Sequence, residues 1–245
     1  MVIYNAKELH HIEKSTKPLI ILLPYAGGNI YSYRPFFNQL DLYFDVLPIE
    51  LPGRGELSSL KILSDINEIT QFIHVNYFNK ILLNKDYYIY GHSMGAIIAY
   101  ELSCLLRGQR KKLPKHIIIS GREGPSAISS KKELHQLPST EFYKELYKMG
   151  GIPNDIINNL ELMKFLEPTL RGDIRAVEMY KCAFQDKLNI PMTVFYGDQE
   201  DLSINNLYLW SNVIKQDVLY KEFHGNHFFI FEHKNEIINY MSNLI

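Results

Sequence analysis

Six short apolar runs, separated by helical patterns, constrain the fold of this chain more than any other feature. Each is rich in β-branched and aromatic residues and lacks polar alternation, as is typical of strands covered by helices on both faces. The runs that predict strands are Leu19–Leu23, Asp45–Ile49, Tyr87–Tyr90, Ile117–Ser120, Met192–Tyr196 and Val218–Phe223. Strands that alternate with helices predict an α/β fold with a mainly parallel sheet.

Helical patterns lie between these runs. The last one covers about Lys234–Leu244, and an earlier one stops before Gly108, a typical helix terminator. The apolar positions of the two clearest stripes are Leu63, Ile66, Ile69, Ile73 and Phe78, and then Ala96, Ile97, Ala99, Tyr100, Leu102 and Leu106.

One connection, residues 121–191, is far longer than a crossover between two strands requires. It contains helical patterns at Ser139–Met149, Asp155–Phe165 and Ile174–Phe184. A helical insertion on the side where strands end is where a lid would lie. We expect a single domain over residues 1–245 with a lid insertion at about 121–191. The alternative is a small second domain without a role at the site.

Composition and charge limit the classes of function. Hydrophobic residues make up 46% of the 245 residues, and 26 basic against 27 acidic residues give a net charge of −1. This balance argues against a general nucleic-acid binder. No apolar run approaches the roughly 18 residues of a membrane span, and the first residues do not resemble a secretory signal. Two cysteines cannot form a disulfide framework. We expect a cytoplasmic monomer that does not bind membranes.

The segment Gly91-His92-Ser93-Met94-Gly95 lies between a predicted strand and a predicted helix. This Gly-x-Ser-x-Gly pattern is typical of a nucleophile on a tight, strained turn, where larger residues than glycine would clash with the neighbouring strand and helix. The N-terminus of the following helix favours negative charge there. The pattern predicts Ser93 as nucleophile and the amide of Met94 as an oxyanion donor, whereas His92 is interpreted as local packing.

A nucleophilic serine needs a base, and the base needs an orienting acid. In α/β-hydrolases they follow in the order serine, acid, histidine. His227 lies in the loop after the last predicted strand, with Phe228 and Phe229 behind it to exclude water. His224 is the alternative, but it directly continues the strand. The two histidines have no evident third ligand, so we expect no metal site.

Three carboxylates compete for the role of orienting acid. Asp198, Glu200 and Asp201 all follow the preceding predicted strand, after Gly197. At least two of them must be solvated surface groups or helix N-terminal charges.

Upstream, the glycine pair Gly27-Gly28 follows the first predicted strand, and such a turn can bring a second backbone amide to the serine.

Several motifs together resemble the stand-alone type II thioesterases that accompany nonribosomal peptide and polyketide synthases. The resemblance covers about residues 18–232. The matching segments are Pro24-Tyr25-Ala26-Gly27-Gly28, Tyr33-Arg34-Pro35-Phe36, Leu51-Pro52-Gly53-Arg54, Gly91-His92-Ser93-Met94-Gly95-Ala96, Gly150-Gly151-Ile152-Pro153, Leu170-Arg171-Gly172-Asp173 and Gly225-Asn226-His227-Phe228-Phe229.

This resemblance implies an α/β-hydrolase fold with a helical lid and hydrolysis of acyl thioesters on the phosphopantetheine arm of carrier proteins. Family members clear stalled or misprimed carriers of antibiotic biosynthesis, and some release product. By matching position, Ser93 is the nucleophile and His227 the base, and the amides of Ala26 and Met94 hold the oxyanion. Family members usually place the acid three residues after the strand-end glycine, which here is Glu200. An aspartate followed three residues later by a β-branched residue also fits the family, and Asp201 with Ile204 supplies that pattern. We choose Asp201, with Glu200 second and Asp198 third. No cofactor is needed.

Two other functions stay open at this point. A carboxylesterase or lipase would use the same triad on oxygen esters, and an inactive hydrolase fold would only bind a ligand or partner. In the insertion, Phe142, Leu146 and Met149 form an apolar stripe with Tyr143 and Tyr147 beside it. The stripe is interpreted as helix core, as an acyl channel under the lid, or as both, since a lid packs on what lies beneath it. Lys131 and Lys132 are candidates for meeting an acidic carrier protein.

Overall fold

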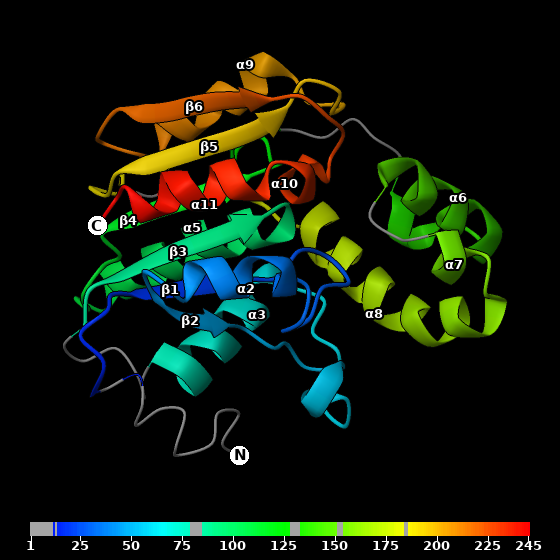
Figure 1. Cartoon of the computed structure of the whole chain (residues 1–245). Helices are drawn as coiled ribbons and strands as arrows, with labels where there is room; N and C mark the ends of the chain where they lie inside the picture. Colours follow the sequence, from blue (N-terminus) through cyan, green and yellow to red (C-terminus); the bar gives the residue numbers. More distant parts are fainter. Residues whose placement is uncertain (1–11, 13, 79–84, 128–132, 151–153, 184–185) are drawn as a thin grey trace.

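The computed structural model describes residues 12, 14–78, 85–127, 133–150, 154–183 and 186–245. Its sheet has six strands in the order β2-β1-β3-β4-β5-β6, and every neighbouring pair is parallel (Figure 1). The strands are β1 (Leu19–Leu23), β2 (Asp45–Pro48), β3 (Tyr87–His92), β4 (His116–Ser120), β5 (Met192–Gly197) and β6 (Val218–Phe223). All six predicted strands are confirmed, to within two residues at each end.

Helices cover both faces of this sheet. They are α2 (Arg34–Leu40), α3 (Ile66–Ile73), α5 (Met94–Gly108) and α11 (Lys234–Ser242). The side chains of Ile20 and Leu22 in β1 belong to an apolar cluster with α2 and α11, whereas Ile21 belongs to a cluster with α3 and α5. Consecutive β1 residues therefore contact opposite helical layers, as a doubly covered sheet requires.

The inserted segment, residues 121–191 between β4 and β5, contributes α6 (Ser139–Met149), α7 (Asn154–Ile157) and α8 (Leu160–Glu178). Figure 1 shows these three helices beside the sheet, with α8 running back toward it. They have an apolar cluster of their own, made of Leu137, Phe142, Leu146, Met163, Leu170 and Ile174.

The sequence prediction for this segment is right for α6 and wrong for the two helices after it. The predicted helix at 155–165 is divided near Asn159, whose side chain accepts a hydrogen bond from the Leu162 amide at 3.1 Å and so caps α8. The predicted helix at 174–184 does not exist as such, because α8 continues through Pro168 to Glu178. Burial of its apolar face outweighs the single hydrogen bond that proline removes.

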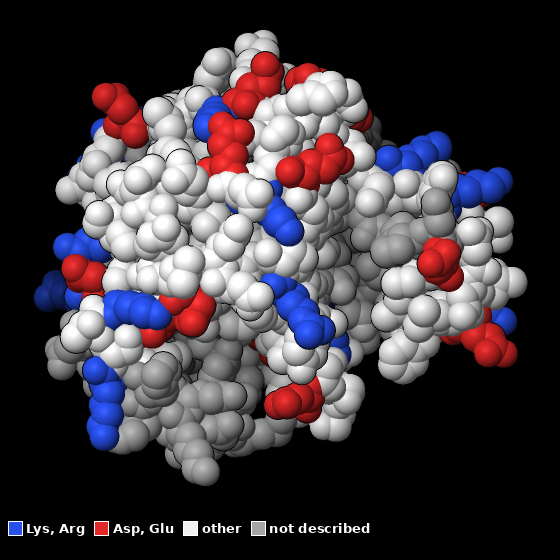
Figure 2. Space-filling model, viewed as in Figure 1, with Lys and Arg blue, Asp and Glu red and all other residues white. Residues whose placement is uncertain are grey.

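Short elements complete the fold. They are α9 (Ile204–Leu207), α10 (Phe229–Glu232), the 3₁₀ turns at Gly55–Leu57, Leu134–Gln136 and Tyr208–Asn212, and a π-helical turn at His74–Phe78. Within the described chain, no helix is long and apolar enough to cross a membrane. On the face seen in Figure 2, acidic and basic side chains are interspersed over the main body, without a broad area of one sign among the described residues.

Candidate active site

Ser93 lies between β3 and α5 in a strained backbone conformation, with φ 54° and ψ −111°. Such a conformation is costly for a residue with a side chain and is typical of functional turns. The turn is possible because its flanking residues are glycines. A Cβ at Gly95 would lie 2.6 Å from the Leu23 carbonyl oxygen, and one at Gly91 would overlap the Gly95 carbonyl. The steric reason predicted for the two glycines is therefore confirmed.

His227 and Glu200 form a close pair at the same end of the sheet. The Nδ1 atom of His227 lies 2.5 Å from Oε1 of Glu200, whose side chain is only 1% exposed. Because an ionised carboxylate can only accept, Nδ1 carries the proton and Nε2 of the neutral ring is left as the basic nitrogen. The second oxygen, Oε2, accepts a hydrogen bond from the Gly197 amide at 2.7 Å, which fixes the carboxylate.

The choice of Asp201 as the partner of His227 is wrong. Asp201 is exposed and Glu200 occupies the position beside the ring. The cause is the turn after β5, in which the Glu200 amide donates to the Gly197 carbonyl at 3.3 Å and the Glu200 side chain folds back over the strand end. The residue that follows points outward. The sequence did contain a signal for Glu200, since it lies three residues after Gly197 at the strand end, where the family usually places its acid. Glu200 was nevertheless only the second choice.

His224 and Asp198 form a second histidine–carboxylate pair, but at the surface. Nδ1 of His224 lies 2.9 Å from Oδ2 of Asp198, and the histidine side chain is 74% exposed against 17% for His227. The hydrogen bond and charge of Asp198 raise the pKa of His224, while a hydrogen bond from the Gly225 amide contributes most to lowering the pKa of Asp198. This pair lies at the surface, and neither of its residues lines the cavity that Ser93 and His227 share.

The turn after β1 lies against the serine turn. The Gly28 amide donates to the Tyr25 carbonyl at 2.8 Å, and the Gly27 amide donates to Oδ2 of Asp173 at 2.7 Å. The amides of Gly27 and Gly28 are therefore directed at other acceptors, while Ala26, the expected second oxyanion donor, lines a cavity together with Ser93. The other expected donor, the amide of Met94, is at the N-terminus of α5.

A small cavity of about 50 Å³ lies between the serine turn, His227 and the inserted segment. Ser93 and His227 line it together with Tyr25, Ala26 and Phe228, and the inserted segment supplies Leu146, Met149, Leu170 and Ile174. The structure therefore brings Leu146 and Met149 to the serine, whereas Phe142 is fully buried in the cluster of the inserted segment.

Behind His227, a buried polar chain was missed in the sequence. The Tyr90 hydroxyl lies 2.9 Å from the Ser120 hydroxyl, which lies 2.9 Å from Nδ1 of His92. The His92 ring is buried, with its centre 4.7 Å from that of His227. Burial, and then the charge of His227, hold the pKa of His92 well below its usual value. His92 is thus a neutral ring that links the ends of β3 and β4.

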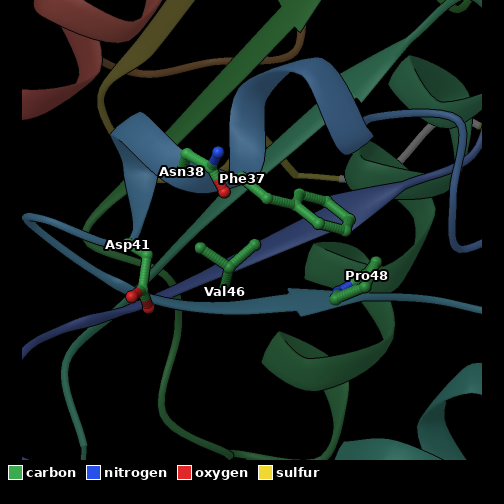
Figure 3. Close-up of a pocket in the computed structure, with 5 residues that line it drawn as sticks. All are labelled: Phe37, Asn38, Asp41, Val46 and Pro48. Atoms are coloured by element: carbon green, nitrogen blue, oxygen red, sulfur yellow. The ribbon is translucent and has the colours of Figure 1, made fainter.

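Other candidate features lie apart from the serine. A larger hollow of about 370 Å³ opens between α2 and β2, lined by Phe37, Asn38, Asp41, Val46 and Pro48 (Figure 3). It contains no nucleophile or histidine. Among the described residues, no group of three or more histidine, cysteine or acidic side chains could hold a metal ion. Lys131, Lys132 and the Gly151–Pro153 part of the family pattern lie outside the described residues.

Comparison with known proteins agrees with this geometry. Residues 18–244 match the thioesterase domain family. Gramicidin S biosynthesis protein GrsT of Aneurinibacillus migulanus is 28% identical over 232 residues, which cover 94% of this chain and 90% of that protein. Among solved structures, ClbQ from the colibactin NRPS/PKS pathway has a TM-score of 0.87 at 28% identity and covers 94% of this chain and 97% of its own. The type II thioesterase BorB from the borrelidin biosynthetic cluster has a TM-score of 0.85 at 29% identity, with 94% and 93% covered.

A parallel sheet whose central strand leads into a strained serine turn is the fold of the α/β-hydrolases, as expected from the sequence. Within that class, the match over nearly the whole chain decides the family. The chain belongs to the thioesterase family and is a thioesterase.

Proposed function

We propose that this thioesterase removes acyl groups from the phosphopantetheine arm of carrier proteins through a Ser93–His227–Glu200 triad. The observation that carries the proposal is the buried Glu200–His227 pair, which shares a cavity with a serine held in a strained turn. The similar proteins support the carrier-bound substrate: ClbQ comes from the colibactin NRPS/PKS pathway, BorB is a type II thioesterase of the borrelidin cluster, and GrsT is a gramicidin S biosynthesis protein.

The reaction proceeds in two steps. Nε2 of His227 takes the proton of the Ser93 hydroxyl as its oxygen attacks the thioester carbonyl, and the amides of Met94 and Ala26 hold the resulting oxyanion. The C–S bond then breaks, and Nε2 returns the proton to the leaving thiolate. Water attacks the acyl-enzyme with the same base and releases the carboxylic acid. Glu200 keeps the ring in the required tautomer throughout.

The inserted segment is proposed to act as a lid over the acyl group. Four of its side chains line the cavity beside Ser93 and His227. A volume of about 50 Å³ has room for only a few water molecules. A short acyl group fits such a space, whereas a longer one requires the helices above it to move. In this proposal, chain length is therefore sensed by the packing of α6 and α8 over the serine.

The test compares the wild type with Ser93→Ala on one acyl group offered in three forms: on a carrier protein, on coenzyme A and as a simple oxygen ester. The wild type should have its highest kcat/KM on the carrier, since docking adds binding energy remote from the carbonyl. Ser93→Ala should lower hydrolysis by about 10³–10⁶-fold without loss of folding.

Two results would contradict the proposal. Near-normal thioester turnover by Ser93→Ala would exclude the serine mechanism. A wild-type preference for the oxygen ester over both thioesters would favour a carboxylesterase instead. A circular dichroism spectrum and thermal melt of each variant provide the folding control.

A further inference from the structure

A buried ion pair connects the inserted segment to the turn after β1. Both carboxylate oxygens of Asp173, on α8, accept from Arg54, with Nη1 to Oδ2 at 2.6 Å and Nη2 to Oδ1 at 2.7 Å. The Asp173 side chain is fully buried and that of Arg54 nearly so. This geometry is the two-pronged pairing that a guanidinium and a carboxylate form best.

Both members of the ion pair also form hydrogen bonds with the backbone of the turn after β1. Oδ2 of Asp173 also accepts from the Gly27 amide at 2.7 Å, and Nη1 of Arg54 also donates to the Gly28 carbonyl at 2.9 Å. Each charged group therefore holds one backbone atom of the turn in addition to its partner. The Gly27 amide directly follows Ala26, whose own amide is the proposed second oxyanion donor, and the Gly28 carbonyl closes the same turn.

The conformation of the turn explains why it needs such support. Gly27 has a φ of 77° and the Gly28 amide bonds to the Tyr25 carbonyl, which together define a type II turn with Ala26 and Gly27 at its centre. In a type I turn the peptide between the two central residues is flipped by about half a rotation. The Asp173 carboxylate can accept from the Gly27 amide only in the observed orientation. It therefore selects the type II form.

Stability alone gives little reason for this pair. Taking two charges out of water costs about as much as their attraction returns, so a buried ion pair is often no better for stability than apolar residues of similar volume. The pair instead defines where specific backbone atoms lie. Leu170, one turn before Asp173 on α8, lines the cavity and packs on Gly27, so the same helix shapes both the acyl space and the turn.

We infer that Arg54 and Asp173 are positioning residues for the oxyanion site, in that they hold the turn whose Ala26 amide stabilises the transition state. This inference rests on the proposed function, since it presumes an oxyanion. The C-terminal half of α8, which carries Asp173, then helps to position the oxyanion site. In this role neither Arg54 nor Asp173 contacts the substrate.

The test is the double variant Arg54→Met/Asp173→Leu. It replaces the pair with apolar side chains of similar volume, so the fold should persist while the turn loses both of its side-chain contacts. Loss of one well-placed oxyanion donor lowers kcat by about 10²–10³-fold. We expect a loss of kcat in this range on a thioester, with KM and the melting temperature close to those of the wild type.

The matched control is Lys85→Met/Asp45→Leu. It removes another buried ion pair, between Lys85 and Asp45, which lies at the beginning of β2 and β3 and therefore at the end of the sheet opposite Ser93. This control should keep kcat within about threefold, as expected for changes outside the transition-state contacts. A double Arg54/Asp173 variant with wild-type kcat would overturn the inference and leave the proposed function intact.

Two further measurements keep the inference testable. If the double variant does not fold, Arg54→Lys keeps the charge but cannot reach both Asp173 and the Gly28 carbonyl in the same planar geometry, and it should lose about tenfold in kcat. Wild-type kcat in that variant would overturn the inference. If the wild type hydrolyses no thioester, the proposed function fails. The rate of Ser93 modification by a fluorophosphonate then replaces kcat as the measured quantity, because the P=O oxygen of the reagent occupies the same oxyanion site. An unchanged modification rate in the double variant would overturn the inference.

Discussion

Glu200→Gln isolates the contribution of the proposed orienting acid. The carboxylate accepts two hydrogen bonds, one from Nδ1 of His227 at 2.5 Å and one from the Gly197 amide at 2.7 Å. A glutamine has a single acceptor oxygen, so its NH₂ group must face one of these two donors. If it faces His227, the ring adopts the opposite tautomer and Nε2 is no longer the base. If it faces Gly197, a buried amide loses its acceptor and the side chain is displaced.

Either outcome should be severe. A carboxylate-to-amide change in a serine triad costs up to about 10⁴-fold in kcat, equivalent to about 5.5 kcal/mol of transition-state stabilisation. Since the Glu200 side chain is 1% exposed, water cannot substitute for it, and we expect a loss of about 10³–10⁴-fold. Glu200→Asp, shorter by one C–C bond of about 1.5 Å, should retain a partial activity between the two.

The assay is single-turnover acylation of Ser93 with a chromogenic thioester, which reports the first chemical step without product release. Asp201→Asn is the matched control, because it makes the same chemical change at the exposed neighbouring position, and it should stay within about twofold, the usual range for surface changes. If Asp201→Asn is crippled while Glu200→Gln is close to wild type, the assignment of the acid from this structure is refuted.

Two other predictions concern stability and motion. Amide hydrogen exchange in the free protein should be faster in α6 than in β3, because lids come from the less stable parts of a fold. Helix α6 buries only Phe142 and Leu146, whereas every residue of β3 is buried. Equally strong protection in both elements would argue against a lid that opens. Burial lowers the pKa of His116 to about 4, so the folded chain resists a proton that the unfolded chain accepts below about 6.5, and stability should fall as the pH drops from 6.5 toward 4. The free energy of unfolding, measured with urea, should fall less between pH 7 and 5 in His116→Gln than in the wild type, by about 1 kcal/mol. This figure is half of what the two pKa values would give, because the ring is only partly buried. An equal fall in both proteins would show that another group is responsible.

The parts of the fold that depend on neighbouring residues could be predicted from the sequence. Each strand is a short apolar run, and the serine turn is determined by glycines two positions away on either side, so six strands and the strained turn could be predicted without any long-range information. The helices of the inserted segment could not. Where α7 ends and α8 begins depends on the Asn159 cap, and the continuation of α8 through Pro168 depends on burial against α6.

The candidate site shows the same division. The sequence limited the acid to three carboxylates in one loop, but only the folded turn decides which of them reaches His227. Asp198 goes to His224, Asp201 is exposed, and Glu200 folds back over the strand end. The contact between Arg54 and Asp173 was beyond prediction, although both lie in segments that resemble the thioesterase family. Those residues are 119 positions apart, and nothing local indicates that they meet.

Two buried carboxylates thus make parallel sets of contacts near the serine turn. Glu200 uses one oxygen for the Gly197 amide of its own turn and the other for the ring of the proposed base. Asp173 uses one oxygen for the Gly27 amide and both for Arg54. In each case a backbone amide and a side-chain donor hold the carboxylate: the guanidinium of Arg54 for Asp173 and the Nδ1–H group of His227 for Glu200. In the proposed mechanism, the base and the oxyanion site are therefore each held by a buried carboxylate. Their alignment therefore depends on the packing of β5 and α8 against the same sheet.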